Sequence, residues 1–185
     1  MLHSKQFSKN ITFTIIGGLV LVLILLLFFY FGQRMKKFRS TEHYYSIKYP
    51  ADWEMEEKMD GVDVIFFSPL ENEVDLFREN VNIVVQDMTG RRMSLAEYSQ
   101  KAIVQMKVVF KDNLIILESK PVKFGGRDGH KFVYIGKGPE QDIKVINYWT
   151  IAGKKAFQFG FTSTVAQFER HSETAEKMAE SFRLE

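Results

Sequence analysis

The stretch HYYSIKYPADWEM, residues 43–55, contains the pattern that decides the fold of the larger part of the chain. One face of a strand is predicted to carry Tyr45, Ile47 and Tyr49, because these residues alternate with the residues of the opposite face. Pro50 ends the pattern, since proline can neither donate to a backbone ladder nor easily continue it. Trp53 follows and is expected to fold back over the edge or the core of the sheet.

Two more strands and a helix are predicted downstream. The strands cover residues 62–68 and 80–88, and the polar residues between them are expected to form a loop. Ser94 and Glu97 have the spacing of a capping box, which predicts a helix that runs to about residue 110. The apolar stripe of this helix consists of Leu95, Tyr98, Ala102, Met106 and Val109, with Ile103 and Phe110 beside it. A stripe with helical spacing indicates a helix that packs on a sheet.

The second half of the chain predicts a series of antiparallel strands. The predicted strands are residues 114–124, 130–136, 143–151 and 155–161, joined by short turns. A last helix is expected after a cap at Ser163 or Thr164, with a stripe of Val165, Phe168, Ala175, Met178, Ala179 and Phe182. Such short turns require antiparallel pairing, and helices on an antiparallel sheet define the α+β class.

The order of these segments resembles a known family. YSIKYPADWE, a strand ending in FFSP, an NVNIVV strand and a SLAEY helix are similar to the PsbP-like domains, a group that includes Mog1 and bacterial DcrB-type lipoproteins. A tight glycine turn and a last helix that closes in Ser181 and Phe182 also fit, so the resemblance covers residues 43–184. It implies an antiparallel sheet with helices on both faces, an α/β/α sandwich. Members of the group include a lumenal subunit of photosystem II and a Ran GTPase-binding protein, which implies a binding function.

The N-terminus contains a long apolar segment. Residues 11–32 carry no charge, and as a helix they would extend about 33 Å, close to the roughly 30 Å of a bilayer's hydrocarbon core. The segment exceeds the core of a signal peptide and no A-x-A-like cleavage site follows it. It therefore predicts a retained single-pass transmembrane helix, with a cleaved signal as the alternative. Because the chain has no cysteine, a lipoprotein anchor is excluded.

The net charge differs in sign between residues 1–39 and the rest of the chain. Residues 1–39 hold six of the 25 Lys and Arg residues and no acid, so residues 40–185 combine 19 basic with 23 acidic side chains, a net charge of −4. The basic pI near 8.7 therefore reflects the membrane flanks and does not indicate nucleic-acid binding. The RMKKFR cluster, residues 34–39, is expected to lie against lipid headgroups.

The orientation has two opposing indications. Four basic residues follow the apolar segment and two precede it, which weakly favours a cytoplasmic C-terminal domain. The photosynthetic and DcrB-like relatives, however, lie across a membrane from the cytoplasm. We therefore expect a cell-membrane protein whose globular domain is extracytoplasmic. The absence of cysteine is compatible with either compartment.

The sequence contains no recognisable catalytic or metal-binding motif. Its histidines are His3, His43, His130 and His171, and none has the i, i+4 spacing or the H-E-x-x-H context of a helical zinc site. There is no G-x-S-x-G elbow, Walker A loop or G-x-G-x-x-G loop. We expect no catalytic, cofactor-binding or metal-binding residues and no cofactor.

Two acidic groups are expected to be solvated loops, because neither matches a calcium-binding loop. The first group is Glu54, Glu56, Glu57, Asp60 and Asp63, and the second is Glu71, Glu73, Asp75 and Glu79. Phe77, beside Leu76 in the second loop, is the candidate for an exposed apolar contact.

The predicted organisation has four parts: an N-terminal tail (1–10), a transmembrane helix (11–32), a basic juxtamembrane linker (33–42) and a PsbP-like globular domain (43–185). The expected function is that of a non-enzymatic, membrane-anchored binding or assembly module, an accessory subunit of a larger membrane complex. Its expected partners are the lipid bilayer and other membrane protein subunits, and no nucleic acid. The alternative is a domain that binds a small ligand or a metal ion on the extracytoplasmic face.

Overall fold

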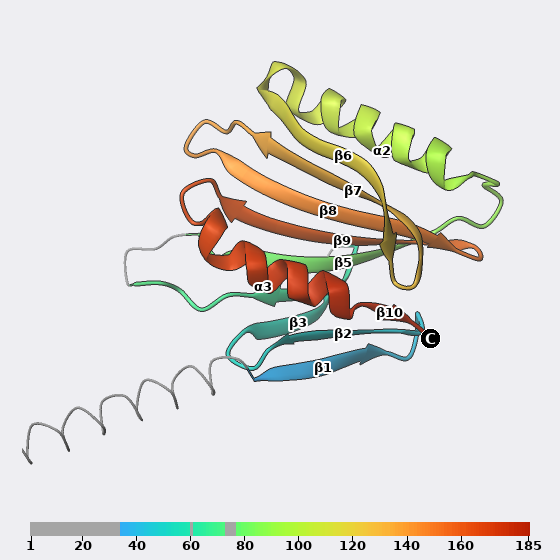
Figure 1. The fold of residues 1–185 in the computed structure, drawn as a ribbon, viewed down its shortest axis with the longest axis horizontal. Helices are drawn as coiled ribbons and strands as arrows, with labels where there is room; N and C mark the ends of the chain where they lie inside the picture. Colours follow the sequence, from blue (N-terminus) through green and yellow to red (C-terminus); the bar gives the residue numbers. More distant parts are fainter. Residues whose placement is uncertain (1–33, 60, 73–76) are drawn as a thin grey trace, which may run out of the picture. The chain divides into compact units, whose positions relative to one another are not determined.

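A computed structural model describes residues 34–59, 61–72 and 77–185 (Figure 1). In chain order its elements are β1 (Met35–Ser40), β2 (Tyr45–Pro50), β3 (Glu54–Met59), β4 (Val62–Phe67), β5 (Asn80–Asp87), α2 (Leu95–Phe110), the short 3-10 helix η1 (Lys111–Asn113), β6 (Leu114–Phe124), β7 (Arg127–Gly136), β8 (Ile143–Ala152), β9 (Lys155–Thr164), α3 (Phe168–Ser181) and β10 (Arg183–Leu184). Residues 36–185 form one compact unit. The mixture of antiparallel strands and two helices confirms the predicted α+β class.

The strands form two sheets, where a single sheet was predicted. A large sheet has the order β3-β4-β5-β9-β8-β7-β6, and a small one has the order β1-β2-β10. Strand β2 of the opening stretch therefore belongs to the small sheet, where the last strand of the chain pairs with it: Leu184 lies opposite Tyr45 and Arg183 opposite Ser46. The prediction of a single sheet was wrong because this pairing joins segments about 140 residues apart, which periodicity cannot detect.

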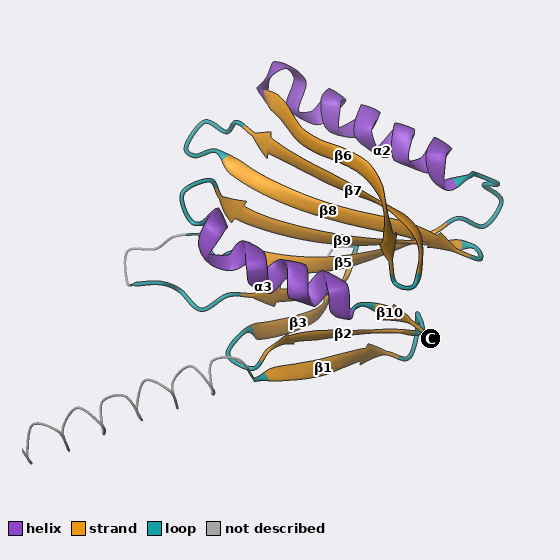
Figure 2. Cartoon of the chain, viewed as in Figure 1, coloured by secondary structure: helices purple, strands orange, loops and turns teal. Residues whose placement is uncertain are grey.

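The large sheet separates two hydrophobic cores (Figure 2). On β7, Val133 contributes to one core and its neighbours Phe132 and Tyr134 to the other, as the alternation of strand side chains requires. Helix α3 and the small sheet cover the first core, and α2 covers the second. Helices thus lie on both faces of the large sheet, as the resemblance implies.

The stretch at residues 43–55 behaves as its pattern predicts. Tyr45, Ile47 and Tyr49 are buried in the core that α3 covers, and Trp53 is only 6% exposed in the same core. The Trp53 N–H donates to the carbonyl of Pro50, which turns the chain back toward the core directly after the strand. The stretch is a structural part of the domain.

Besides β10, strands β1 and β3 were not predicted from the sequence. The predicted linker of residues 33–42 contains β1, whose Phe38 is buried in the core. The first acidic group contains β3, an edge strand on which every residue is exposed. Neither strand has the regular alternation of apolar and polar residues that identifies a half-buried strand, so periodicity does not reveal them.

The two helices differ in how closely they follow their predicted patterns. In α2, Ser94 accepts from the Glu97 N–H and the Glu97 carboxylate accepts from the Ser94 N–H, which confirms the capping box. Val109, predicted in the apolar stripe, is 63% exposed. Helix α3 begins at Phe168, later than predicted, because the Thr164 hydroxyl accepts from the N–H of Gln167 and forms a turn ahead of the helix.

In the part of the chain that the structure covers, no helix has the length and hydropathy needed to cross a bilayer. The transmembrane helix predicted at residues 11–32 lies outside the described residues.

Candidate functional site

The structure places three of the four histidines on separate elements. His43 lies in the turn between β1 and β2, His130 on β7 and His171 on α3, while His3 lies outside the described residues. No three His, Cys, Asp or Glu side chains in residues 34–59, 61–72 and 77–185 are arranged to hold a metal ion. Three clusters of polar groups in the described part of the chain join separate elements of the fold.

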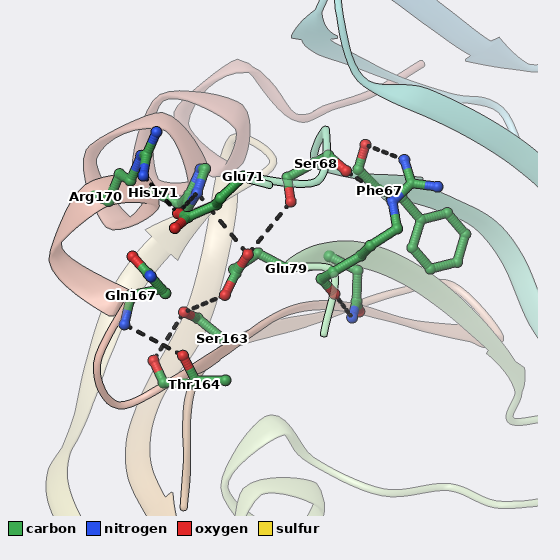
Figure 3. A network of polar contacts seen from close by, with 11 residues as sticks. Phe67, Ser68, Glu71, Glu79, Ser163, Thr164, Gln167, Arg170 and His171 are labelled. Carbon is green, nitrogen blue, oxygen red and sulfur yellow. Dashed lines mark hydrogen bonds and ion pairs between the residues drawn. The ribbon is translucent and has the colours of Figure 1, made fainter. Parts of the chain in front are cut away.

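The first cluster surrounds a buried carboxylate (Figure 3). Glu79, directly before β5, is 1% exposed. The hydroxyl of Ser68 donates to one of its oxygens at 3.4 Å, and the hydroxyl of Ser163 donates to the other at 3.3 Å. Since a buried charge is costly without partners, these contacts explain how the position tolerates a glutamate.

Helix α3 supplies the other half of this cluster. Arg170 lies 2.8 Å from the Glu71 carboxylate, and Nε2 of His171 lies 3.5 Å from Glu71 and 3.9 Å from Glu79. The His171 ring also contacts Trp53 edge-on. The cluster therefore joins the segment after β4 to the first turns of α3.

The prediction that the second acidic group forms a solvated loop was thus only partly right. Glu79 is buried and the side chain of Glu71 is only 8% exposed, although a solvated loop was expected, because their partners come from β9 and α3, about 80 to 100 residues downstream. Glu73, Asp75 and Leu76 lie outside the described residues. Phe77, the predicted exposed contact, is partly buried.

The second cluster joins α3 to the large sheet. Glu176 accepts a hydrogen bond from the Tyr148 hydroxyl and from Lys131, whose ammonium lies 2.7 Å away. Burial raises the pKa of Tyr148, and the hydrogen bond to Glu176 raises it further. Burial also acts to lower the pKa of Lys131, but the bonds to Glu176 and Tyr148 outweigh this and raise it. All three groups hold the helix in place.

The third cluster contains His43 and lies beside a pocket of about 300 Å³. Lys155 Nζ lies 3.1 Å from Nδ1 of His43, and because an ammonium can only donate, Nδ1 accepts. The proton of the neutral ring therefore sits on Nε2, 3.4 Å from Asp63. The other carboxylate oxygen of Asp63 accepts from the Tyr45 hydroxyl at 2.5 Å.

This third cluster was not predicted. His43 and Lys155 are 112 residues apart, and Asp63 was expected in a solvated loop, although its side chain is only 10% exposed. The alternation in the opening stretch correctly indicated that Tyr45 is buried. No local sequence signal showed what its hydroxyl would bind.

Comparison with known proteins identifies the fold. The family model described as PsbP matches residues 33–184. No match was found among curated proteins.

Solved structures with the same fold come from distant organisms. The cyanobacterial PsbP (CyanoP) of Synechocystis has a TM-score of 0.61 at 14% identity, with 82% of this chain and 92% of that chain covered. LpqN of Mycobacterium tuberculosis, described as involved in cell envelope biogenesis, has a TM-score of 0.59 at 9% identity, covering 82% and 90%. The Ran-binding protein Mog1p of Saccharomyces cerevisiae has a TM-score of 0.57 at 8% identity, covering 82% and 95%. At such identities the likeness concerns the fold alone.

Proposed function

This chain belongs to the PsbP family, and on that premise we propose that it is a non-enzymatic, membrane-anchored binding or assembly module. It acts as an accessory subunit of a larger membrane protein complex, with its globular domain on the extracytoplasmic side. The bilayer and other membrane subunits are its partners.

The junction between the apolar segment and the domain carries this proposal. The uncharged run ends at residue 32, the family match begins at residue 33, and β1 begins at Met35. A removable signal peptide would be expected to leave a cleavage site and a spacer before the folded domain. Here the apolar segment leads directly into the first strand, as expected for a permanent anchor.

The polar clusters support a binding function over an enzymatic one. Glu176, Glu79 and Asp63 each accept hydrogen bonds from side chains of the same domain. These groups stabilise contacts between elements, so they do not form an open set of reactive groups. A binding module needs only its outer surface to recognise a partner.

Gentle solubilisation tests the proposal. Membranes that contain the tagged full chain are dissolved in a mild detergent, and the size of the purified particle is measured by native mass spectrometry. We expect a mass well above 21.6 kDa, with other membrane proteins in fixed ratio to this chain. A chain that always runs alone, in several detergents, contradicts the proposal.

The orientation of the domain across the membrane can be tested by labelling a single introduced cysteine, because the chain has no cysteine of its own. Tyr44→Cys introduces one thiol at a side chain that is 64% exposed. In intact cells a membrane-impermeant maleimide is expected to label this variant and leave the cysteine-free parent unlabelled. Labelling only after lysis would place the domain in the cytoplasm.

The pocket beside His43 supports a second candidate function, the binding of a small ligand or a metal ion. Its volume of about 300 Å³ and its His43 and Asp63 walls are compatible with a small polar molecule. Calorimetry with calcium, zinc and manganese, and the same titrations on Asp63→Asn, test this candidate. Binding that the substitution abolishes supports it, and an absence of heat in every titration argues against it.

A further inference from the structure

A basic hollow lies at the end of the large sheet where α2 begins. It has a volume of about 1000 Å³ and is formed by the loop between β5 and α2 and by the β8–β9 hairpin. The Met88 N–H donates to the Lys154 carbonyl at 2.7 Å, which holds the loop against the hairpin. Met88 is buried and Ile151 partly buried on the apolar part of its lining. The hollow is therefore a built concavity with an apolar floor.

Three exposed cations line this hollow. They are Arg91, Arg92 and Lys154, and within the described residues none of them forms an ion pair. Elsewhere on the domain many cations are paired, as Lys131 is with Glu176 and Lys144 with Glu169. The nearest carboxylate along the chain from Arg91, that of Asp87, accepts from the N–H of Thr89 and attracts Lys154 electrostatically without forming an ion pair with it.

The charge of this region differs from that of the rest of the domain. Residues 88–111 contain five basic residues and one acid, while residues 40–185 as a whole have a net charge of −4. The single acid, Glu97, is engaged in the capping box of α2. Because the helix end is already capped, the three cations, and not the helix terminus, give the hollow its positive potential.

The hollow lies far from the start of β1 within the described domain. Lys155, next to Lys154 in the hairpin, contacts His43 at the far end of β1. A strand of six residues places that end about 17 Å from the start of β1, where the chain leaves the domain toward residues 11–32. Figure 1 shows the start of β1 and the β8–β9 hairpin at opposite ends of the domain. Within the described domain, the hollow therefore lies away from the strand end at which the chain enters it.

From these observations we propose that the hollow docks an acidic segment of a partner protein. Carboxylates of that segment pair with Arg91, Arg92 and Lys154, and an aliphatic side chain lies on the floor beside Met88 and Ile151. The proposal rests on the proposed binding function and identifies the surface and the partner chemistry. Paired arginines suit this role because each guanidinium can hold a carboxylate with two parallel hydrogen bonds.

The test uses the full chain in lipid nanodiscs of neutral phosphatidylcholine. The probe is a fluorescent peptide of four glutamates around one leucine, and the matched peptide has lysines in place of the glutamates. We expect the acidic peptide to bind, the basic peptide not to bind, and the affinity to fall at least tenfold in Arg91→Glu/Arg92→Glu. The milder Arg91→Gln/Arg92→Gln is expected to show a smaller loss at an unchanged melting temperature.

A matched control separates the hollow from general charge effects. Lys107→Glu/Lys137→Glu makes the same change in net charge at exposed cations outside the hollow, and it is expected to retain peptide binding within about twofold. Equal losses in both double variants overturn the proposal. Absence of acidic-peptide binding to the parent chain also overturns it.

Two further experiments test whether a lipid or a second copy of the chain occupies the hollow. Arginine-dependent binding of soluble dihexanoyl phosphatidylglycerol without peptide binding would assign the hollow to lipid. Arginine-dependent self-association without peptide binding would assign it to a second copy, whose exposed strand β3 is acidic. Either result overturns the proposal.

The solubilisation experiment separates this proposal from the proposed function. If Arg91→Glu/Arg92→Glu keeps its membrane partners, the hollow is not their docking surface, although the assembly function stands. If the parent chain itself runs alone, the assembly function fails, and the peptide titration still reports on the hollow.

Discussion

The side chain of His130, on the large sheet, makes the stability of the domain depend on pH. Its ring stacks on that of Trp149, with 5.1 Å between the centroids, and its Nε2 lies 2.9 Å from the Ser119 hydroxyl. Burial lowers the pKa of this imidazole below its ordinary value of 6.5. The folded state therefore favours the neutral ring, while the unfolded chain takes up a proton at a higher pH.

The resulting prediction concerns stability in mild acid. As the pH falls through 6.5, the unfolded state binds the proton first, so His130 contributes a loss of stability that continues until the lower folded pKa is reached. Urea unfolding of residues 33–185 at pH 7.5 and pH 5.5 is expected to show a larger loss for the parent than for His130→Gln. Equal losses, or an imidazole pKa of 6.5 or more by NMR titration, would refute this.

Tyr148 supports a second prediction at this scale. Tyr148→Phe keeps the buried ring but removes the hydrogen bond to the Glu176 carboxylate, so it should cost about 1.5–3 kcal/mol of unfolding free energy. Tyr44→Phe is the control, because Tyr44 is largely exposed and its change should stay within about 0.5 kcal/mol. Denaturant unfolding of both variants measures the difference, and similar values would show that the Glu176 bond adds no stability.

At the scale of elements, the residue that links α3 to the last strand packs against the end of β6. Phe182, between α3 and β10, is fully buried and stacks on Phe124 with 4.5 Å between the ring centroids. The turn after Phe124 contains Gly125 and Gly126, both with positive φ. A Cβ on Gly125 would lie 3.0 Å from the Phe182 ring, whereas a Cβ on Gly126 would meet nothing within 4 Å.

These neighbouring glycines provide a matched pair of variants. Gly125→Ala and Gly126→Ala both introduce a side chain at positive φ, but only the first also presses on Phe182. We expect Gly125→Ala to be the more destabilising by about 1–3 kcal/mol, the usual cost of overpacking a core. Thermal unfolding of the two variants gives the comparison, and a greater cost at Gly126 would contradict the packing argument.

The elements also show what sequence patterns can and cannot predict. The α2 capping box and the alternation of Tyr45, Ile47 and Tyr49 are local signals, and both predictions are confirmed. Strand β3 buries no residue, so it has no periodic signal. The pairing of β2 with β10 was missed because it depends on contacts between distant segments.

The same dependence on contacts between distant segments explains why the polar clusters were not predicted from the sequence. Each polar cluster joins residues from separate elements, as Lys155 joins His43 across 112 positions. Sequence motifs detect chemistry only when the groups have a fixed spacing along the chain. The arginine pair at residues 91 and 92 and the hairpin turn at residues 152–154 are both visible in the sequence, but the contact between them that forms the hollow is not.

At the scale of the whole molecule, the proposed anchor makes a direct prediction. The full chain should remain in the membrane pellet after extraction with alkaline carbonate, because residues 11–32 are long and apolar enough to span a bilayer. A chain that begins at residue 33 should appear in the soluble fraction. Intact-mass measurement of the membrane-bound form is expected to show residues 1–32 retained, and their loss would establish the cleaved-signal alternative.

The start of β1 at Met35 also sets the length of chain between the proposed membrane span and the domain. In the proposed arrangement only Gln33 and Arg34 separate the span from the first strand, a leash of at most about 7 Å. Such a leash would keep the attachment point of the domain close to the bilayer surface. A partner in the same membrane then meets the domain by two-dimensional diffusion and at a high effective concentration, so even a weak docking contact suffices for assembly.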